Sequence, residues 1–321
     1  MKQISKTTFF NTFKIAAAAI VAVLFAYVLE LEHPISAGIA AILTIQPTKK
    51  ETIKTAIGRF LAFICAMLIA FLCFKIFGYN VAAFCVYLII FIFVCQIFGW
   101  YSAMAMDSVL ISHFLIAENM KINTVLNEAA IFLLGVGIGI IANLHLKKNI
   151  NYIEELKENT DNQIKKILRR MSERILDRDI SDYNGECFVV LRDSIRKAKN
   201  VAEENFNNQF GKGDTYDKEY ILMRERQCHI LYEMYKSVRT IETAPLTAEK
   251  ISRFLLDVSE AYHKDNTAKE LLDEFYELNN SMKEKPLPVE RTEFEDRAKL
   301  YTLLRYIEEF LMIKAGFAEK H

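Results

Sequence analysis

Apolar and polar residues alternate in two different patterns along this chain. Up to about residue 147, long apolar runs are separated by short polar breaks, and six apolar segments can be drawn there: 9–31, 35–46, 56–77, 81–98, 101–117 and 125–146. Runs of about 17 or more such residues have the length of a transmembrane helix. The pattern predicts an all-α membrane protein with six transmembrane helices in residues 1–147 and a second domain in residues 148–321.

The second apolar segment is the unusual one. It lies between Pro34 and Pro47, is rich in small residues, and would rise about 20 Å as a helix against a hydrocarbon core of about 30 Å. A flanking half-turn at each end would complete a short crossing. Otherwise the segment ends inside the bilayer, where protein or water must bond its end groups. Interrupted helices of the second kind form the substrate site in many transporters, so both prolines are candidates for the transport path.

Basic residues set the expected orientation. With six crossings, one side of the membrane receives nine Lys and Arg residues and the other side only Lys75 and Lys121. Positive residues favour the cytoplasmic side, whereas five crossings would place the C-terminal half outside. We therefore expect a multi-pass protein of the cell (plasma) membrane with both termini in the cytoplasm. The nine residues are Lys2, Lys6, Lys14, Lys49, Lys50, Lys54, Arg59, Lys147 and Lys148.

Small residues repeat every fourth position on three of the segments. Such spacing lets helix backbones approach closely in lipid, although alanine is common in membrane helices in any case. The third helix is also expected to begin before the membrane, because Thr48 and Glu51 have the spacing of a capping box. The repeats are Ala18, Ala22 and Ala26; Gly58, Ala62, Ala66 and Ala70; and Gly135 and Gly139.

Ionisable residues at membrane depth are the candidates for function. Arg59 and Asp107 lie one to two turns from the cytoplasmic ends of their helices. They are therefore at similar depth in the membrane, and an ion pair between them is geometrically possible. Charged residues in the bilayer normally have a partner or a wet cavity. One reading is that Arg59 attracts an organic anion and Asp107 tunes that charge. The other is that Arg59 extends to lipid phosphates while Asp107 faces cytoplasmic water.

His113 lies further along the same helix as Asp107. A histidine at that depth can relay protons, or it can simply be hydrogen-bonded within the packing. Glu30, Glu32 and His33 gather just before Pro34, either as an outer vestibule or as a solvated helix end.

The C-terminal half has an amphipathic helical pattern. Helices are expected near 184–208, 215–243, 248–263, 266–282 and 292–315, the last capped by Thr292 with Glu295, and the sixth membrane helix is expected to run on past residue 147. No phosphate loop, HExxH or GxSxG motif occurs, and the six cysteines form no CxxC pair, so we expect no enzyme activity, no cofactor and no metal site. The formal net charge of zero gives no indication of nucleic-acid binding.

Three stretches resemble a known family. LELEHPISAGIAAILTIQPTKKETIKTAIGRF near the start, and GVGIGIIANLHLKKN followed by LPVERTEFEDRAKLYTLLRYIEEFL, resemble the aromatic acid exporter family of Gram-positive bacteria. The resemblance covers essentially the whole chain. Through relatives in the fusaric-acid-resistance superfamily it implies export of aromatic carboxylates, and plant malate channels are distantly similar. Larger exporters carry two six-helix modules, so a single module implies a homo-oligomer, a dimer or higher.

The leading hypothesis is therefore an exporter of small organic anions, proton-coupled in one version. A passive anion channel is the second hypothesis. The third is a membrane anchor for a cytoplasmic helical domain that binds a protein partner. The lipid bilayer, a small organic anion and a second copy of the chain are the expected partners.

Overall fold

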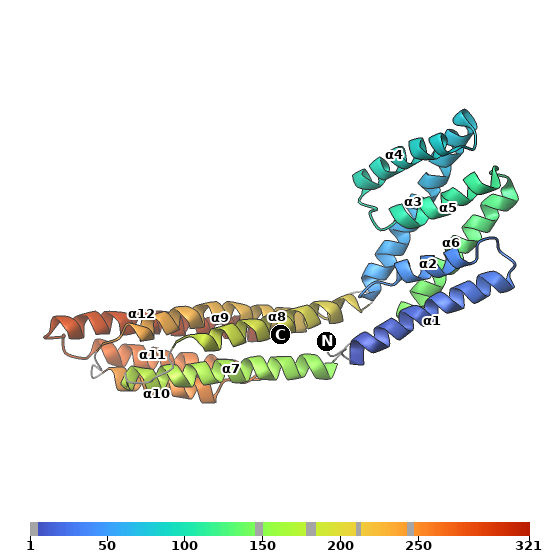
Figure 1. Ribbon diagram of the computed structural model, residues 1–321. Coiled ribbons are helices and arrows are strands. Elements are labelled where there is room, and N and C mark those ends of the chain that lie inside the picture. Colours follow the sequence, from blue (N-terminus) through green and yellow to red (C-terminus); the bar gives the residue numbers. More distant parts are fainter. Residues whose placement is uncertain (1–5, 145–149, 178–183, 210–212, 243–246) are drawn as a thin grey trace. The chain divides into compact units, whose positions relative to one another are not determined.

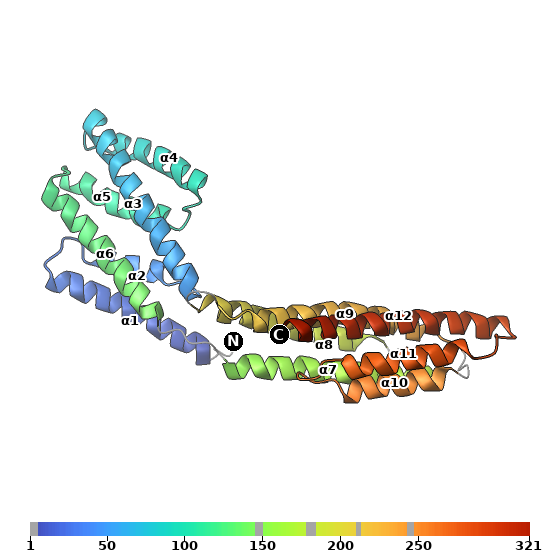
Figure 2. The same cartoon turned by 180° about the vertical axis from the view of Figure 1, so that it is seen from behind.

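The computed structural model describes residues 6–144, 150–177, 184–209, 213–242 and 247–321. Within these residues every regular element is an α-helix, as expected. The chain divides into two compact units, one of Met1–Lys147 with Asn207–Lys212 and the other of Lys148–Phe206 with Gly213–His321. We call them the membrane unit and the C-terminal unit, and describe each by itself (Figures 1 and 2).

In its described residues, the membrane unit contains six helices of unequal length. Four of them, α1, α3, α4 and α6, are long and apolar enough to cross a membrane. Two are shorter: α2 has ten residues and α5 has 14. The fifth predicted segment loses its first turn because Tyr101, Ser102 and Ala103 form a turn before α5. The helices are α1 (Lys6–Val28), α2 (Ile35–Thr44), α3 (Lys49–Phe77), α4 (Val81–Phe98), α5 (Met104–Ala117) and α6 (Ile122–Leu144).

Local signals account for three of the helix boundaries in this unit. The Thr48 side chain accepts a hydrogen bond from Glu51 N at 3.3 Å, which confirms the predicted cap of α3. Asn80 caps α4 in the same way, accepting from Ala83 N at 2.9 Å. Gly99 ends α4 with a φ of 70°, a left-handed conformation that favours glycine.

Small residues form the contacts that the spacing predicted. Ala22 and Ala26 of α1 and Ala62, Ala66 and Ala70 of α3 are fully buried. Helix α2 contacts α1, α3, α5 and α6, whereas α4 packs on α3 and α5. Most large side chains on the outside of the unit are apolar, as lipid contact requires.

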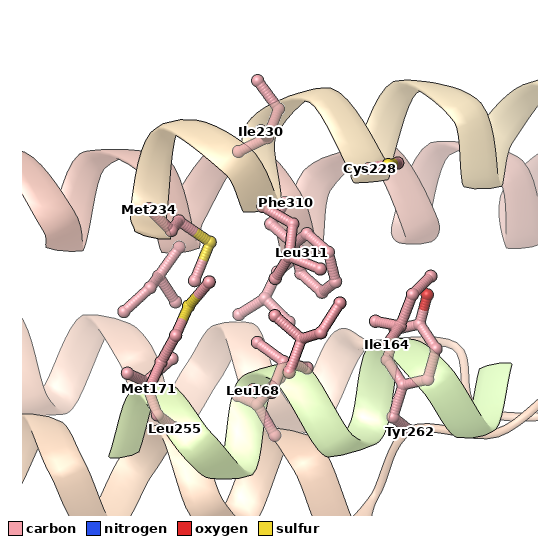
Figure 3. Packing of buried hydrophobic residues seen from close by; sticks show 14 of the residues in the cluster. Ile164, Leu168, Met171, Cys228, Ile230, Met234, Leu255, Tyr262, Phe310 and Leu311 are labelled. Carbon is pink, nitrogen blue, oxygen red and sulfur yellow. The ribbon is translucent and has the colours of Figure 1, made fainter. Parts of the chain in front are cut away.

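Over its described residues, the C-terminal unit is a bundle of six helices around its own core. Helix α7 packs against α9 and α10, and α12 packs against α9 and α11. Figure 3 shows the centre of this core, where Met171 of α7 and Met234 of α9 extend toward each other. The helices are α7 (Ile150–Leu176), α8 (Glu186–Asn207), α9 (Tyr216–Arg239), α10 (Ala248–Glu260), α11 (Lys269–Lys283) and α12 (Arg291–Lys320).

Two expectations about helix ends have different outcomes here. The predicted cap at Thr292 is wrong, because α12 already begins at Arg291 with Glu290 before it, so Thr292 lies in the first turn. The expected continuation of the sixth helix depends on residues 145–149, which lie outside the described residues.

Candidate functional site

The short helix α2 lies at the centre of the membrane unit. Its ten residues rise about 15 Å, half the thickness of the hydrocarbon core. Pro34 precedes the helix without a side-chain cap, and Ile45 ends it in an extended conformation. The two prolines therefore mark the ends of α2, Pro34 beside His33 and Pro47 in the link to α3.

Glycines on α6 allow the backbones of α2 and α6 to touch. A Cβ atom built on Gly135 would lie 2.4 Å from Ala40 Cβ and 2.5 Å from Ala37 O. One built on Gly139 would lie 2.8 Å from Thr44 Cβ. Because no side chain fits at these two positions, α2 is fixed against α6 by close backbone packing.

Arg59 of α3 is enclosed by protein, and its side chain contacts the C-terminal end of α2. Its side chain is 2% exposed, and its Nη1 donates to Thr44 Oγ1 at 3.2 Å. Its Nε has no hydrogen-bond partner within the described residues. Burial of this guanidinium argues against the alternative in which Arg59 extends to lipid phosphates, because an extended head group would be exposed.

Asp107 is also enclosed, and it is left unsatisfied. The residue is fully buried, and neither carboxylate oxygen has a hydrogen-bond partner in the part of the chain that the structure describes. The charges of Arg59 and Asp107 interact electrostatically, but no ion pair between them is formed among these residues. Unpaired buried polar groups are costly, so this pair is typical of a site that takes up water or a ligand. We call Thr44, Arg59 and Asp107 the arginine cluster.

Aromatic rings follow the arginine along α3. Phe63 lies one turn after Arg59, on the same face of the helix, and its ring stacks on Phe132 of α6 at 4.6 Å between centroids. Both rings belong to the apolar cluster that includes Met106 of α5, whose Sδ lies 3.8 Å from Arg59 Nη1. A cation and buried aromatic surface therefore occur side by side.

Asn143 organises the non-helical link between α2 and α3. Its Nδ2 donates to Gln46 O at 2.8 Å and to Thr52 Oγ1 at 2.5 Å, and its Oδ1 accepts from Lys14 Nζ at 2.7 Å. The amide thus bonds backbone that would otherwise be unsatisfied. Neither Asn143 nor Lys14 was among the site residues predicted from the sequence.

His113 has a partner that the sequence reading missed. Its Nδ1 lies 2.7 Å from Glu128 Oε2 of α6, and its Nε2 lies 3.4 Å from Ser36 Oγ of α2. Glu128 is fully buried. A glutamate in the first turns of an apolar segment was a visible signal, whereas its pairing with α5 is a property of the fold.

A further buried charge lies in the C-terminal unit. Arg224 of α9 is fully buried and donates two hydrogen bonds to Asp161 of α7, from Nε to Oδ1 at 2.8 Å and from Nη2 to Oδ2 at 3.0 Å. Tyr220 donates to the same carboxylate at 2.5 Å, and Gln227 accepts from Arg224 Nη1 at 2.7 Å. Since these groups satisfy one another, the network is structural. Nearby, burial together with Arg224 lowers the pKa of Lys314 to about 8.

No group of three or more His, Cys, Asp or Glu side chains is placed to hold a metal ion in the ranges that the structure covers. Four membrane-length helices and buried ionisable residues around an interrupted helix define an integral membrane protein.

Comparison with known proteins identifies its family. The family model described as "Aromatic acid exporter family member 1" matches residues 7–146, and "Putative aromatic acid exporter C-terminal domain" matches residues 151–315. The chain belongs to the aromatic acid exporter family, which confirms the resemblance and indicates a transport protein, in a family that is not enzymatic.

Individual relatives extend over different shares of the chain. "Uncharacterized protein YqjA" of Bacillus subtilis (strain 168) is 29% identical over 312 residues, covering 96% of this chain and 95% of the relative. The crystal structure of a "putative membrane protein" from Clostridium difficile 630 is 25% identical, with a TM-score of 0.46, and covers 51% of this chain and 98% of that one.

Proposed function

We propose that the protein exports small organic anions, aromatic carboxylates in particular, across the cell membrane. The observation that carries this proposal is the arginine cluster at the end of an interrupted helix, in which a buried guanidinium lies near a buried carboxylate that has no hydrogen-bond partner among the described residues. Arg59 would attract the carboxylate of the substrate, and the Phe63 and Phe132 rings one turn away would contact its aromatic ring. Family membership supports the direction of transport.

Six crossings, with both termini in the cytoplasm, complete the proposal. Helices α2 and α5 would each complete a crossing with their flanking turns. A chain with one six-helix module would then assemble as a dimer or higher oligomer to form the pathway.

Efflux from proteoliposomes tests the proposal. Vesicles loaded with labelled benzoate and phenylacetate should release label faster when they contain the protein. R59Q should reduce this release at least about tenfold, because losing a charge-assisted hydrogen bond to a buried carboxylate costs about 1.5–3 kcal/mol. R59K should retain part of the release, since it keeps the charge but not the planar fork.

K54Q is the matched control, because Lys54 is an exposed cation about one turn before Arg59 on the same helix. It should release label at the wild-type rate. An equal rate of release by R59Q and by the wild type would contradict the assigned site. Benzoate current that follows the electrochemical gradient, without any response to a pH gradient, would instead identify a passive channel. No release by the wild-type protein, combined with specific capture of a soluble protein partner by the full chain, would favour the anchor hypothesis.

A further inference from the structure

A second polar cluster occupies the other end of α2. It consists of His113 of α5, Glu128 and Asn127 of α6, Ser36 of α2, and His33 in the turn before α2, and we call it the histidine cluster. At its centre, His113 Nδ1 and Glu128 Oε2 are 2.7 Å apart, with exposed fractions of 7% and 0%. The arginine cluster and the histidine cluster are thus separated by the ten residues of α2.

The central pair is built to exchange one proton. A neutral His113 imidazole beside a Glu128 carboxylate carries a single negative charge, and binding of one additional proton gives the pair no net charge. A buried site at membrane depth disfavours uncompensated charge, so protonation of the two groups is coupled. Asn127 Nδ2 donates a hydrogen bond to Glu128 Oε1 at 3.0 Å, which stabilises the charged form of the carboxylate. Histidine is the side chain that changes charge between about pH 5 and pH 8.

His33 gives the pair access to water. Its ring stacks on His113 with 4.1 Å between centroids, and His33 is exposed. Two stacked imidazoles do not both carry a charge readily, since like charges repel at this distance. Transfer of a proton from His33 to the buried pair therefore relieves a charge that would otherwise repel a protonated His113.

The surroundings of the pair offer few other charges. The groups that face it are His33 from the turn before α2, Ser36 from α2, and Glu128 with Asn127 from α6. On α5 itself, Ser112 donates to Val109 O, and Asp107 lies six residues earlier, about 9 Å along the helix. No Lys or Arg forms an ion pair with Glu128 among the residues described.

We propose that His113 and Glu128 form the proton-binding site that couples proton entry to anion export. This inference rests on the proposed export function. One proton reaches the pair by way of His33 and is released to the opposite side of the membrane. No covalent bond in the substrate is altered. Because α2 touches the arginine cluster through Thr44 and the histidine cluster through Ser36, it is the element through which the two sites communicate.

Titration of His113 tests proton binding without any substrate. The full-length protein, with isotope-labelled histidine rings, is followed by NMR in detergent between about pH 5 and pH 8, with the six histidines assigned by substitution. His113 should titrate in the wild type. In E128Q its midpoint should fall by at least about one pH unit, because the neutral amide no longer stabilises the imidazolium ion. E118Q, which changes an exposed carboxylate in the turn after α5, should leave the midpoint in place.

Two results would overturn the proton site. In one, wild-type His113 keeps a single protonation state throughout this range, a result that needs no variant to fold. In the other, the His113 midpoint is the same in E128Q and in the wild type.

Transport then tests coupling. In proteoliposomes, a pH gradient should accelerate wild-type benzoate efflux, and E128Q should lose that acceleration while retaining measurable exchange of labelled for unlabelled benzoate at equal pH. E128D, which keeps a carboxylate, should recover part of the response. An E128Q protein that responds to the gradient like the wild type would overturn the coupling and leave export intact. If the wild type moves neither benzoate nor phenylacetate, the export proposal fails. The titration of His113 remains an independent test of the proton site, because it uses no substrate.

Discussion

At the scale of single residues, a buried lysine predicts how stability depends on pH. Lys314 Nζ donates to Lys264 O at 2.7 Å, and burial with nearby Arg224 lowers the Lys314 pKa to about 8 from an ordinary 10.5. Between these values the unfolded chain binds more protons than the folded one, so the free energy of unfolding contributed by this group rises with pH. K314M should lack that rise, and should be relatively more stable at neutral pH.

Chemical unfolding of the full-length protein in detergent, monitored between about pH 7 and pH 10.5, checks the difference between the two proteins. K285M replaces an exposed lysine in the link before α12 and should follow the wild-type profile. Parallel profiles for the wild type and K314M would contradict the assignment of this pH dependence to Lys314.

Several residues show which contacts between helices could not be predicted from the sequence. The amphipathic pattern predicted the helix that is α9, and its apolar face, including Ile221, Leu231 and Val238, is buried. Tyr220, Arg224 and Gln227 share one face of the same helix by spacing, but their carboxylate partner Asp161 belongs to α7, and no local pattern connects the two helices. Arg59 and Asp107 were identifiable because charge is rare in apolar segments, whereas packing determines that the described residues show no direct ion pair between them.

At the scale of elements, contact between α2 and α6 predicts a strong difference between two glycines. A Cβ atom at Gly135 would overlap Ala40 Cβ and Ala37 O, whereas one at Gly137 would meet nothing within 4 Å. G135A should therefore lower the thermal unfolding midpoint, at an overpacking cost of about 1–3 kcal/mol. G137A makes the same chemical change on the same helix and should leave the midpoint unchanged or raise it slightly, because alanine favours helix over glycine.

Thermal unfolding of both variants in detergent micelles gives the comparison, and equal midpoints would show that α2 does not pack on α6 in this way. The predicted spacing of small residues was sufficient to identify these faces. It was insufficient to identify the partner: the glycines of α6 receive α2, and the alanines of α3 pack in the apolar cluster with α4 and α5. Element lengths were less predictable, because Tyr101, Ser102 and Ala103 include no glycine, proline or charged residue that would separate this turn from the helix that follows.

At the scale of the whole molecule, the lengths of α2 and α5 decide the topology. Four helices are long enough to cross, so crossings by both short helices or by neither leave the two termini on the same side. The basic residues distinguish these cases. Six crossings place nine Lys and Arg residues of the first 150 positions on one side and two on the other, whereas four crossings divide them six to five. The positive-inside rule favours the uneven division.

A crossing by α2 is physically possible because the backbone that follows its C-terminal end is bonded by protein. Asn143 bonds the carbonyl of Gln46, and Thr52 Oγ1 accepts from Gln46 N at 3.1 Å, so extended backbone can lie at membrane depth without facing lipid. With six crossings, a cysteine at Lys54 should react with a membrane-impermeant maleimide only in inverted vesicles, and one at Lys75 only in intact cells. K54C and K75C in a cysteine-free background measure this, since both lysines are exposed. Four crossings would exchange the two results, because α3 would then run in the opposite direction through the membrane.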